Sequence, residues 1–344
     1  MKNLLKLSAS ALAIMLMTTG VQAEGKLSLY NWFEYMPQAL LDKFAKEHNV
    51  EVTMDTYDSN ETMLAALKAG KLGSYDLAVP SDYMVAIMGT EGMLDTFEPS
   101  DLSNFANIKP NWLDVSFDKG RKSSIPYQVG TTSFSVNRDV YKGEINTLEV
   151  MFNPPAELKG KINALDSQGE VLALASMYLG IPQCSTNKEQ LKSLNTLLQN
   201  VKGDWASINA DIAKDALVSG DVAAGMIWSG FAAKARQEGA NVEYAFPKEG
   251  FVVWMDNVVL LKQAPNRDNA IKFMNFMLEP ENAATLTNFA QYSAGVIGAE
   301  AFLSDEVKNL PEANPPADGT TQFVQSCPQK VQEVYDSIWT NLKK

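Results

Sequence analysis

This chain contains little positive charge, little histidine and little cysteine, and each shortage excludes a class of protein. Its 29 Lys and Arg are outnumbered by 41 Asp and Glu, which argues against nucleic acid or an anionic membrane surface as a partner. The single histidine and two distant cysteines cannot form a zinc-type cluster with sensible spacing, and we expect His48 to mark a helix end. We therefore expect neither a metal ion nor a cofactor.

The chain also lacks the sequence motifs of several large enzyme classes. It has no G-x-S-x-G elbow, no Walker P-loop and no Rossmann glycine fingerprint. The segment "STNK" at 185–188 matches S-x-x-K, but neither S-D-N nor K-T-G accompanies it. We therefore expect a binding protein and not an enzyme.

Long hydrophobic runs are absent too, because no apolar stretch approaches the ~20 residues that a membrane span needs. The N-terminus instead has two lysines, a short apolar run and a small-x-small triplet at 21–23. This pattern predicts a secretory signal peptide over residues 1–23, a mature chain that starts at Glu24, and a periplasmic location. In that oxidising compartment Cys184 and Cys327 could form a disulfide, but the sequence does not decide whether they pair.

What the chain does contain is a regular alternation of strand and helix patterns. Strands are predicted at 26–30, 50–57, 75–81, 160–166 and 222–228. Helices are predicted between them, the last at 210–219. This order predicts an α/β fold with a largely parallel sheet. The length of 344 residues is too great for one ordinary core and suits two lobes of roughly 150 residues each.

Two β-rich segments are predicted to cross between the lobes. Residues 125–137 carry Gly130 inside a strand pattern, and residues 251–261 form a run too long for one lobe. We place the hinges near Gly130 and Asp256. Lobe 1 is then formed by residues 24–130 and 257–302, and lobe 2 by residues 131–256 and 303–344. The ligand is expected in the cleft between the lobes, at the carboxyl ends of strands.

Aromatic rings and carboxylates recur where these strands end. Strand side chains alternate between faces, so Trp32 and Glu34 should point the same way, as should Trp254 and Asp256. The others at strand ends are Tyr83, Asp166, Glu170 and Trp228. Any one ring is more simply core packing, and any one acid more simply a solvated cap. Together they suit an organic cation, because carboxylates pair with ammonium groups and ring faces attract positive charge.

Several motifs resemble one family. The segments "YNWFEY", "YDSNETM", "YDLAVPSDY", "GMIWSG" and "PKEGFVVWMD" are similar to signature segments of periplasmic spermidine/putrescine-binding proteins. The resemblance runs from about Lys26 to the C-terminus. It implies a two-lobed class II periplasmic binding protein fold, and a monomer that captures a polyamine and delivers it to an ABC-type permease in the inner membrane. The candidate ligand contacts are Trp32, Glu34, Tyr35, Ser81, Tyr83, Asp166, Ser167, Glu170, Trp228, Trp254, Asp256, Tyr292 and Gln325.

Three positions depart from the family pattern. Phe33 stands where spermidine binders usually have a small hydroxyl residue, and Ser167 stands where they have an acid, although Asp166 is adjacent. Phe231 stands where putrescine binders tend to have an aspartate. The first two departures bear on recognition of one terminal amine, whereas Phe231 favours spermidine over putrescine as the ligand.

The same fold also serves other functions. A ferric-ion binder would need clustered phenolate ligands, and this chain has no adjacent tyrosines. A polyamine sensor that docks on a membrane signalling receptor is an alternative, as is a binder of another small organic cation.

Overall fold

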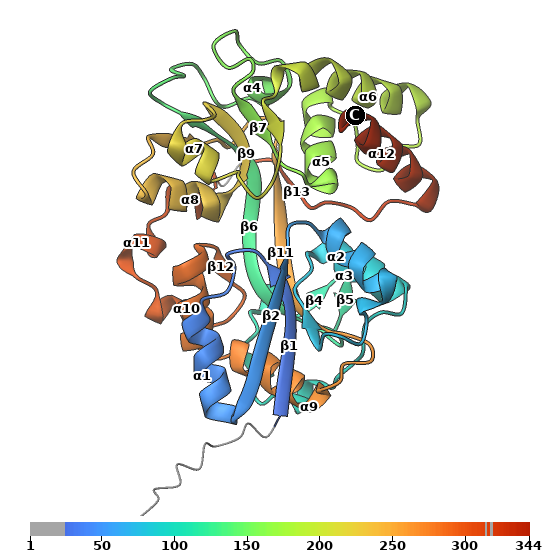
Figure 1. Cartoon of the computed structure of the whole chain (residues 1–344), viewed down its shortest axis with the longest axis vertical. Coiled ribbons are helices and arrows are strands. Elements are labelled where there is room, and N and C mark those ends of the chain that lie inside the picture. The colour runs from blue at the N-terminus through green and yellow to red at the C-terminus, as the bar shows by residue number, and fades with distance from the viewer. Residues whose placement is uncertain (1–24, 314, 317–318) are drawn as a thin grey trace, which may run out of the picture.

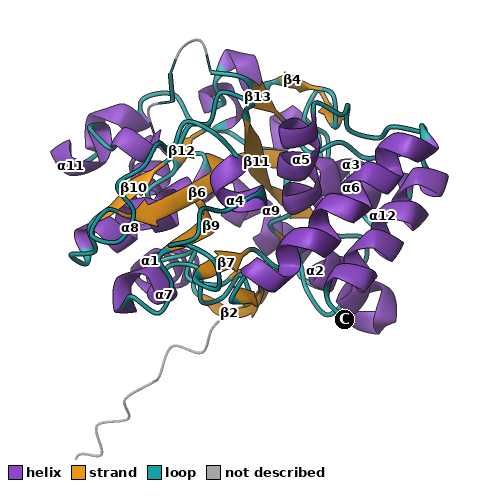
Figure 2. Cartoon of the chain, turned by 90° about the horizontal axis from the view of Figure 1, so that it is seen from above, coloured by secondary structure: helices purple, strands orange, loops and turns teal. Residues whose placement is uncertain are grey.

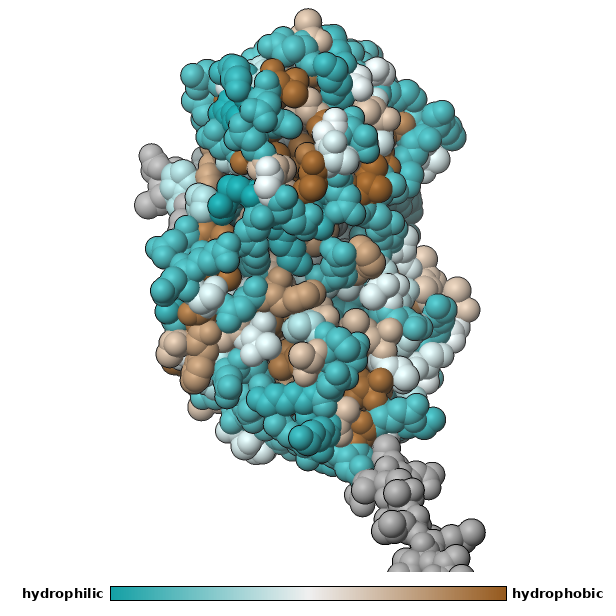
Figure 3. Space-filling view, turned by 60° about the vertical axis from the view of Figure 1, so that its left-hand side comes forward, coloured by the Kyte–Doolittle hydropathy of each residue, from teal (hydrophilic) through white to brown (hydrophobic). Residues whose placement is uncertain are grey.

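The computed structural model describes residues 25–313, 315–316 and 319–344 of the chain. The predicted signal peptide and the predicted mature N-terminus lie outside these residues. Among the described residues, no helix is both long enough and apolar enough to cross a membrane. On the face drawn in Figure 3 the surface is mostly hydrophilic, with hydrophobic residues in separate small patches.

The N-terminal part alternates strands and helices as predicted: β1 (Gly25–Trp32), α1 (Gln38–His48), β2 (Val50–Tyr57), α2 (Asn60–Ala66), β3 (Leu77–Ala78) and α3 (Asp82–Thr90). The first helix, α1, illustrates how local sequence determines these elements. It places Leu40, Leu41 and Phe44 on one buried face, and it ends at His48 because Asn49 adopts the left-handed conformation that closes a helix. The prediction that His48 marks a helix end is confirmed.

The central part forms a second α/β unit. Its elements are α4 (Glu149–Phe152), β7 (Ile162–Ala164), α5 (Gln168–Leu179), α6 (Lys188–Val201), β8 (Ser207–Ile208), α7 (Asp215–Ser219), β9 (Ala224–Trp228), α8 (Ser229–Gln237) and β10 (Val242–Tyr244). The helix predicted at 210–219 is shorter than expected, because it begins only at Asp215. A two-stranded hairpin, β4 (Asp114–Val115) with β5 (Asp118–Lys119), lies apart from the main sheet.

Two antiparallel strands run through the middle of the molecule, β6 (Ser124–Asn137) and β11 (Phe251–Leu260) (Figure 1). One end of β11 pairs with β3, and its other end pairs with β13 (Thr321–Gln322). Likewise, β6 pairs with β12 (Ser293–Ala294) and with β9. The two predicted crossing segments are therefore present as strands that join both units. The assignment of residues to the two lobes stays a prediction, because its boundaries fall inside continuous strands.

Apart from the hairpin of β4 and β5, the strands form one sheet, whose main path is β2-β1-β3-β11-β6-β9-β7-β8. The sheet is mixed and not largely parallel as predicted, because β11 and β6 pair antiparallel with each other and with β3 and β9. Helices cover the strands on both sides, with α5, α6 and α12 on one side and α7, α8 and α11 on the other (Figure 2). The C-terminal helices are α9 (Arg267–Met277), α10 (Pro280–Ala290), α11 (Asp305–Lys308) and α12 (Gln329–Leu342). The chain returns to its first unit with α9, which packs on β1, and α10, which packs on α1. It ends with α12 against α5 and α6.

A disulfide joins Cys184 to Cys327, with the two Cα atoms 5.1 Å apart. It connects the chain that follows α5 to the chain that precedes α12. The pairing that the sequence left open is thus present in the structure.

Candidate ligand-binding site

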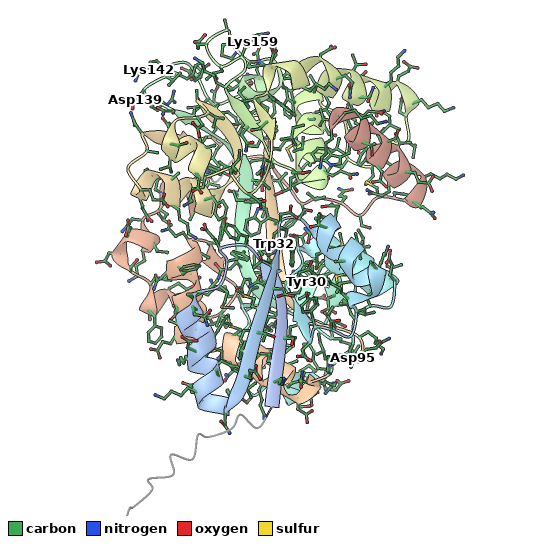
Figure 4. The ribbon with its side chains drawn as sticks, in the orientation of Figure 1. Tyr30, Trp32, Asp95, Asp139, Lys142 and Lys159 are labelled. Carbon is green, nitrogen blue, oxygen red and sulfur yellow. A yellow bond between two sulfur atoms is a disulfide. The ribbon has the colours of Figure 1, made fainter. Side chains whose placement is uncertain are left out.

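A pocket of about 690 Å³, open to solvent, lies where the two α/β units meet. Its wall includes the end of β1, the start of α3, the first turn of α5, the end of β9 and the middle of β11. Figure 4 shows one of these positions, Trp32, at the end of β1 in the middle of the molecule. The carboxyl ends of strands from different parts of the chain meet here, which is the usual ligand position in open α/β sheets.

Asp256 is one of the buried acids of the pocket, with an exposed fraction of 4%. Its Oδ1 accepts a hydrogen bond from the Ser81 hydroxyl at 2.6 Å. The pKa of Asp256 is raised from 3.8 to about 8, mainly by burial and in smaller part by the negative charges of Asp82 and Glu170, while hydrogen bonds from Ser81 and Tyr35 lower it. Among the described residues, no Lys or Arg forms an ion pair with Asp256. The pocket therefore presents a carboxyl group that a cationic ligand would stabilise in its ionised form.

Asp82, another acid of the pocket lining, has a structural role. One carboxylate oxygen accepts the backbone N–H of Met255 and the other accepts the backbone N–H of Tyr83, each at 2.7 Å. These bonds tie β11 to the start of α3, so they hold the backbone beside Asp256 in place. Burial raises the pKa of Asp82 to about 7.

Glu170 connects the two tryptophans of the pocket through hydrogen bonds. The indole Nε1 of Trp254 donates to the Thr132 hydroxyl at 2.9 Å, and that hydroxyl donates to Glu170. The indole Nε1 of Trp228 donates to Glu170 Oε1 at 3.1 Å. Burial raises the pKa of Glu170, while these donors lower it. Glu170 thus orients both rings and adds a second buried carboxyl group.

Aromatic rings form the sides of the pocket. The Trp32 indole donates to the Val79 carbonyl at 2.7 Å, which fixes its ring, and lies 6.3 Å from the Trp228 ring. Phe231 packs edge-on against Trp228 at 5.5 Å. These faces can cover the methylene chain of a ligand and attract a positive charge.

The Trp254 ring depends on a glycine. Gly130 faces Trp254 across the β6 and β11 pair, and a Cβ atom at this position would lie 2.5 Å from the indole and 2.8 Å from Tyr292. Any larger residue would therefore displace the rings. Tyr292 packs on Trp254 at 4.9 Å, and Tyr35 packs on Tyr292 at 5.6 Å.

Comparison with known proteins agrees with this architecture. The family model of bacterial extracellular solute-binding proteins matches residues 39–315. The chain belongs to this family. It is 35% identical over 96% of its length to the spermidine/putrescine-binding periplasmic protein of Escherichia coli, of which it covers 95%. It is 36% identical over 88% of its length to the protein of the same name from Salmonella typhimurium, of which it covers 87%.

The fold also matches solved structures of this family. A structure described as a spermidine/putrescine ABC transporter from Listeria monocytogenes superimposes with a TM-score of 0.87 at 32% identity, covering 92% of this chain and 98% of the other. The expected class II periplasmic binding protein fold is confirmed. The relatives are binding proteins of transport systems, so this family member is not an enzyme, as expected.

Nine of the thirteen predicted contact residues line the pocket: Trp32, Tyr35, Ser81, Tyr83, Glu170, Trp228, Trp254, Asp256 and Tyr292. The other four do not. Trp254 and Asp256, two residues apart on β11, line it together as the strand periodicity predicted. Contact with a ligand stays a prediction for each of them.

Glu34 is the first correction. Side-chain alternation along the strand predicted that Glu34 points the same way as Trp32. However, β1 ends at Trp32, and the backbone of Glu34 adopts the left-handed conformation with φ of 51°. Strand periodicity does not extend into a turn, so the Glu34 side chain is exposed and does not line the pocket.

Three further residues also lie outside the pocket lining. The Asp166 carboxylate forms an ion pair with Lys343 at 2.6 Å. Ser167 is the residue before the first turn of α5 and its hydroxyl donates toward Glu170. Gln325 is exposed. The ion pair of Asp166 joins residues far apart in the sequence, so local sequence patterns do not reveal it.

The pocket also contains residues that sequence reasoning did not select as contacts: Phe33, Tyr57, Asp58, Asn60, Asp82, Ala210, Asp211, Phe231 and Val324. Tyr57 and Asp58 could have been found, because they end and follow β2 just as Trp32 ends β1. Asp211 was hidden, because β8 has only two residues and the segment after it was predicted as helix.

Proposed function

We propose that this chain captures a polyamine in the pocket, spermidine in preference to putrescine, and delivers it to an ABC-type permease in the inner membrane. The observation that carries the proposal is the pair Asp256 and Glu170, two buried carboxyl groups between aromatic rings. Among the described residues neither forms an ion pair with a Lys or Arg. A buried carboxylate is costly without a cation, so a ligand with several ammonium groups suits this pocket.

The ring-lined wall of the pocket also favours a flexible organic cation. Trp32, Trp228 and Trp254 supply ring surface along its sides, and each cation-π contact contributes about 0.5 to 2 kcal/mol. Phe231 adds apolar surface next to Trp228 and no charge. A triamine can pair with more carboxylates than a diamine can, which supports the preference for spermidine.

A calorimetric titration of the mature protein against spermidine, putrescine, an unrelated organic cation and an uncharged solute tests the proposal. We expect spermidine to bind at least about tenfold more tightly than putrescine, which corresponds to about 1.4 kcal/mol. Equal affinities would contradict the preference for the triamine. Binding of the uncharged solute with no binding of either polyamine would reject the ligand class.

We further propose that the mature chain begins at Glu24 after export and works as a monomer, since one chain forms the whole pocket. The family is extracellular and the relatives named above are periplasmic, which supports this location. Intact mass and light scattering of protein purified from the periplasm measure both properties. An uncut Met1 or a stable dimer would contradict them.

A further inference from the structure

Arg121 is a buried cation behind the strand that carries Asp256. It has an exposed fraction of 0%, and among the described residues no Asp or Glu forms an ion pair with it. Its backbone adopts the left-handed conformation, with φ of 51°, which is uncommon for any residue but glycine. A buried charge and a strained backbone are both costly, so the contacts around Arg121 must hold this side chain in one place.

The guanidinium group bonds to two parts of the chain. In the segment around it, Nε donates to the Trp112 carbonyl at 2.7 Å and Nη1 donates to the Ser124 hydroxyl at 3.0 Å. On β11, the same Nη1 donates to Asn257 Oδ1 at 2.7 Å, and Nη2 lies 3.0 Å from the Met255 sulfur. Arg121 therefore contacts the residues on either side of Asp256.

The positive charge of Arg121 is retained in spite of its burial. The Ser124 hydroxyl donates to Asp118 Oδ2 at 2.6 Å and so connects the guanidinium group to a carboxylate. Burial lowers the pKa of Arg121 to about 10, and the Asp118 charge opposes this shift. The group is thus positive at pH 7, and its hydrogen bonds to neutral acceptors are charge-assisted.

The side chains of β11 alternate between two faces at this point. Trp254 and Asp256 line the pocket, whereas Met255 and Asn257 do not, and Arg121 contacts them on the opposite face. Asn257 Nδ2 donates in turn to the Met255 carbonyl at 2.8 Å. The link from Arg121 through Asn257 to Met255 thus spans the backbone of Asp256 from behind the pocket.

The strand depends on such a restraint because its pairing is irregular here. Asp256 lies opposite Gln128 of β6, but Asn257 lies opposite Pro126, so the register shifts between the two residues. Pro126 has no backbone N–H to donate to β11. Irregularities of this kind re-aim a side chain and are common next to functional sites. The direction of the Asp256 side chain therefore depends on what holds this step of the strand.

We propose that Arg121 is a positioning residue, which fixes this step of β11 through Asn257 and Met255 and so holds the Asp256 carboxyl group in the pocket. Arg121 itself does not line the pocket, so its effect on a ligand passes through Asp256. The inference deepens the proposed function and rests on it, since it affects binding only if Asp256 pairs with an ammonium group of the ligand.

The test compares Arg121→Lys and Asn257→Ala with a matched control, Asn282→Ala. Lysine keeps the charge but lacks the planar fork that bonds Asn257 and residues 112–124 together. Asn282 matches Asn257, because both have an exposed fraction of 0% and both donate from Nδ2 to a backbone carbonyl. Its Oδ1 also accepts from a cation, Lys43, at 2.6 Å. Asn282 lies in α10 outside the pocket lining, so its loss should destabilise the protein without moving Asp256.

We expect two readouts to change in Arg121→Lys and Asn257→Ala but not in Asn282→Ala. NMR titration of isotope-labelled aspartate carboxyl groups, without ligand, should show the pKa of Asp256 falling from about 8 toward its ordinary value of 3.8, because a displaced carboxyl group meets more water. The Asp256→Asn variant assigns its signal. Titration calorimetry should show spermidine and putrescine binding roughly tenfold more weakly.

A double variant tests whether the effect passes through Asp256. In the Asp256→Asn background, Asn257→Ala should cause no further loss of affinity, since the carboxyl group that it positions is absent. Thermal unfolding of each variant reports folding, and Asn257→Ala decides the outcome if Arg121→Lys is unstable.

The outcomes separate this inference from the proposed function. The inference is wrong if either readout in Asn257→Ala equals that of wild type, or if Asn282→Ala shows the same changes. A further loss in the Asp256→Asn background would also overturn it. If neither polyamine binds the wild-type protein, the proposed function fails, and the NMR titration still decides whether Arg121 positions Asp256.

Discussion

Asp256→Asn should weaken polyamine binding more than substitution of any other acid in the pocket. Asp256 is buried, and Ser81 holds its carboxylate, whereas both oxygens of the equally buried Asp82 already accept backbone N–H groups. Removing one partner of a desolvated charge pair costs about 2 to 5 kcal/mol, or roughly 30-fold to several thousandfold in affinity. Titration calorimetry with spermidine measures the loss, and Asp221→Asn, which removes an exposed charge outside the pocket lining, is the charge-matched control. An unchanged affinity would remove Asp256 from the ligand site.

The same variant, Asp256→Asn, should also abolish the release of a proton that accompanies ligand binding. At pH 7 the Asp256 carboxyl of the free protein is mostly protonated, because burial raises its pKa to about 8. An ammonium group favours the ionised form, so binding releases close to one proton and the affinity increases from pH 6 to pH 8. Titrations in buffers with different ionisation enthalpies count this proton. Its persistence in Asp256→Asn would assign it to another group.

The stability of the ligand-free protein should decrease over the pH range in which the ligand affinity increases. The folded-state pKa of Asp256 lies above its ordinary value of 3.8, so the folded state holds the proton more tightly between these two values. The contribution of Asp256 to stability is thus fully present below about pH 4 and is lost as the pH rises toward 8. Asn cannot ionise and lacks this loss. We therefore expect Asp256→Asn to gain stability over wild type as the pH rises, while it loses affinity.

Removal of the disulfide should lower the free energy of unfolding by about 2 to 4 kcal/mol. Cys184 and Cys327 are 143 residues apart in sequence, so their bond strongly restricts the unfolded chain. It joins the segments flanking α5 and α12 and does not line the pocket. Denaturant titration of the double variant Cys184→Ser and Cys327→Ser should show the loss, with the polyamine affinity within about twofold of wild type.

A reducing agent provides the control for this prediction. It should lower the unfolding midpoint of wild type toward that of the double variant and leave the double variant unchanged. If reduction does not change the wild-type midpoint, the disulfide does not stabilise the protein. A large loss of affinity would instead mean that the bond acts on the pocket.

Local patterns were sufficient to predict most of the elements of this fold. The apolar face of α1 and the stop at Asn49 are set by residues close together in sequence, and so is the alternation that puts Trp254 and Asp256 on one face of β11. The two crossing strands were also predictable, since residues 125–137 carry a strand pattern around Gly130 and residues 251–261 form a run too long for one lobe. These features depend on helix and strand periodicity, which a single sequence carries.

The structure differs from the expectations where a strand stops or where a distant segment returns. Glu34 lies outside the pocket lining because strand geometry ends two residues earlier, at Trp32. Asp166 also lies outside the pocket lining, and it forms an ion pair with Lys343 from the end of the chain. Asp211 was missed because a strand of two residues leaves no periodic signal.

The sequence by its own patterns thus predicted an α/β chain with rings and acids at strand ends, and its motifs identified the family. The tertiary structure alone decided which of those acids share a pocket. Asp256, Glu170, Asp58 and Asp211 come from β11, α5 and the segments after β2 and β8, and they meet because the sheet places those strand ends together. Charge interactions depend on distance and on exclusion of water, and both arise only when the chain is folded. That is why the same residue type, aspartate, is a paired surface acid at 166 and a buried carboxyl group of pKa about 8 at 256.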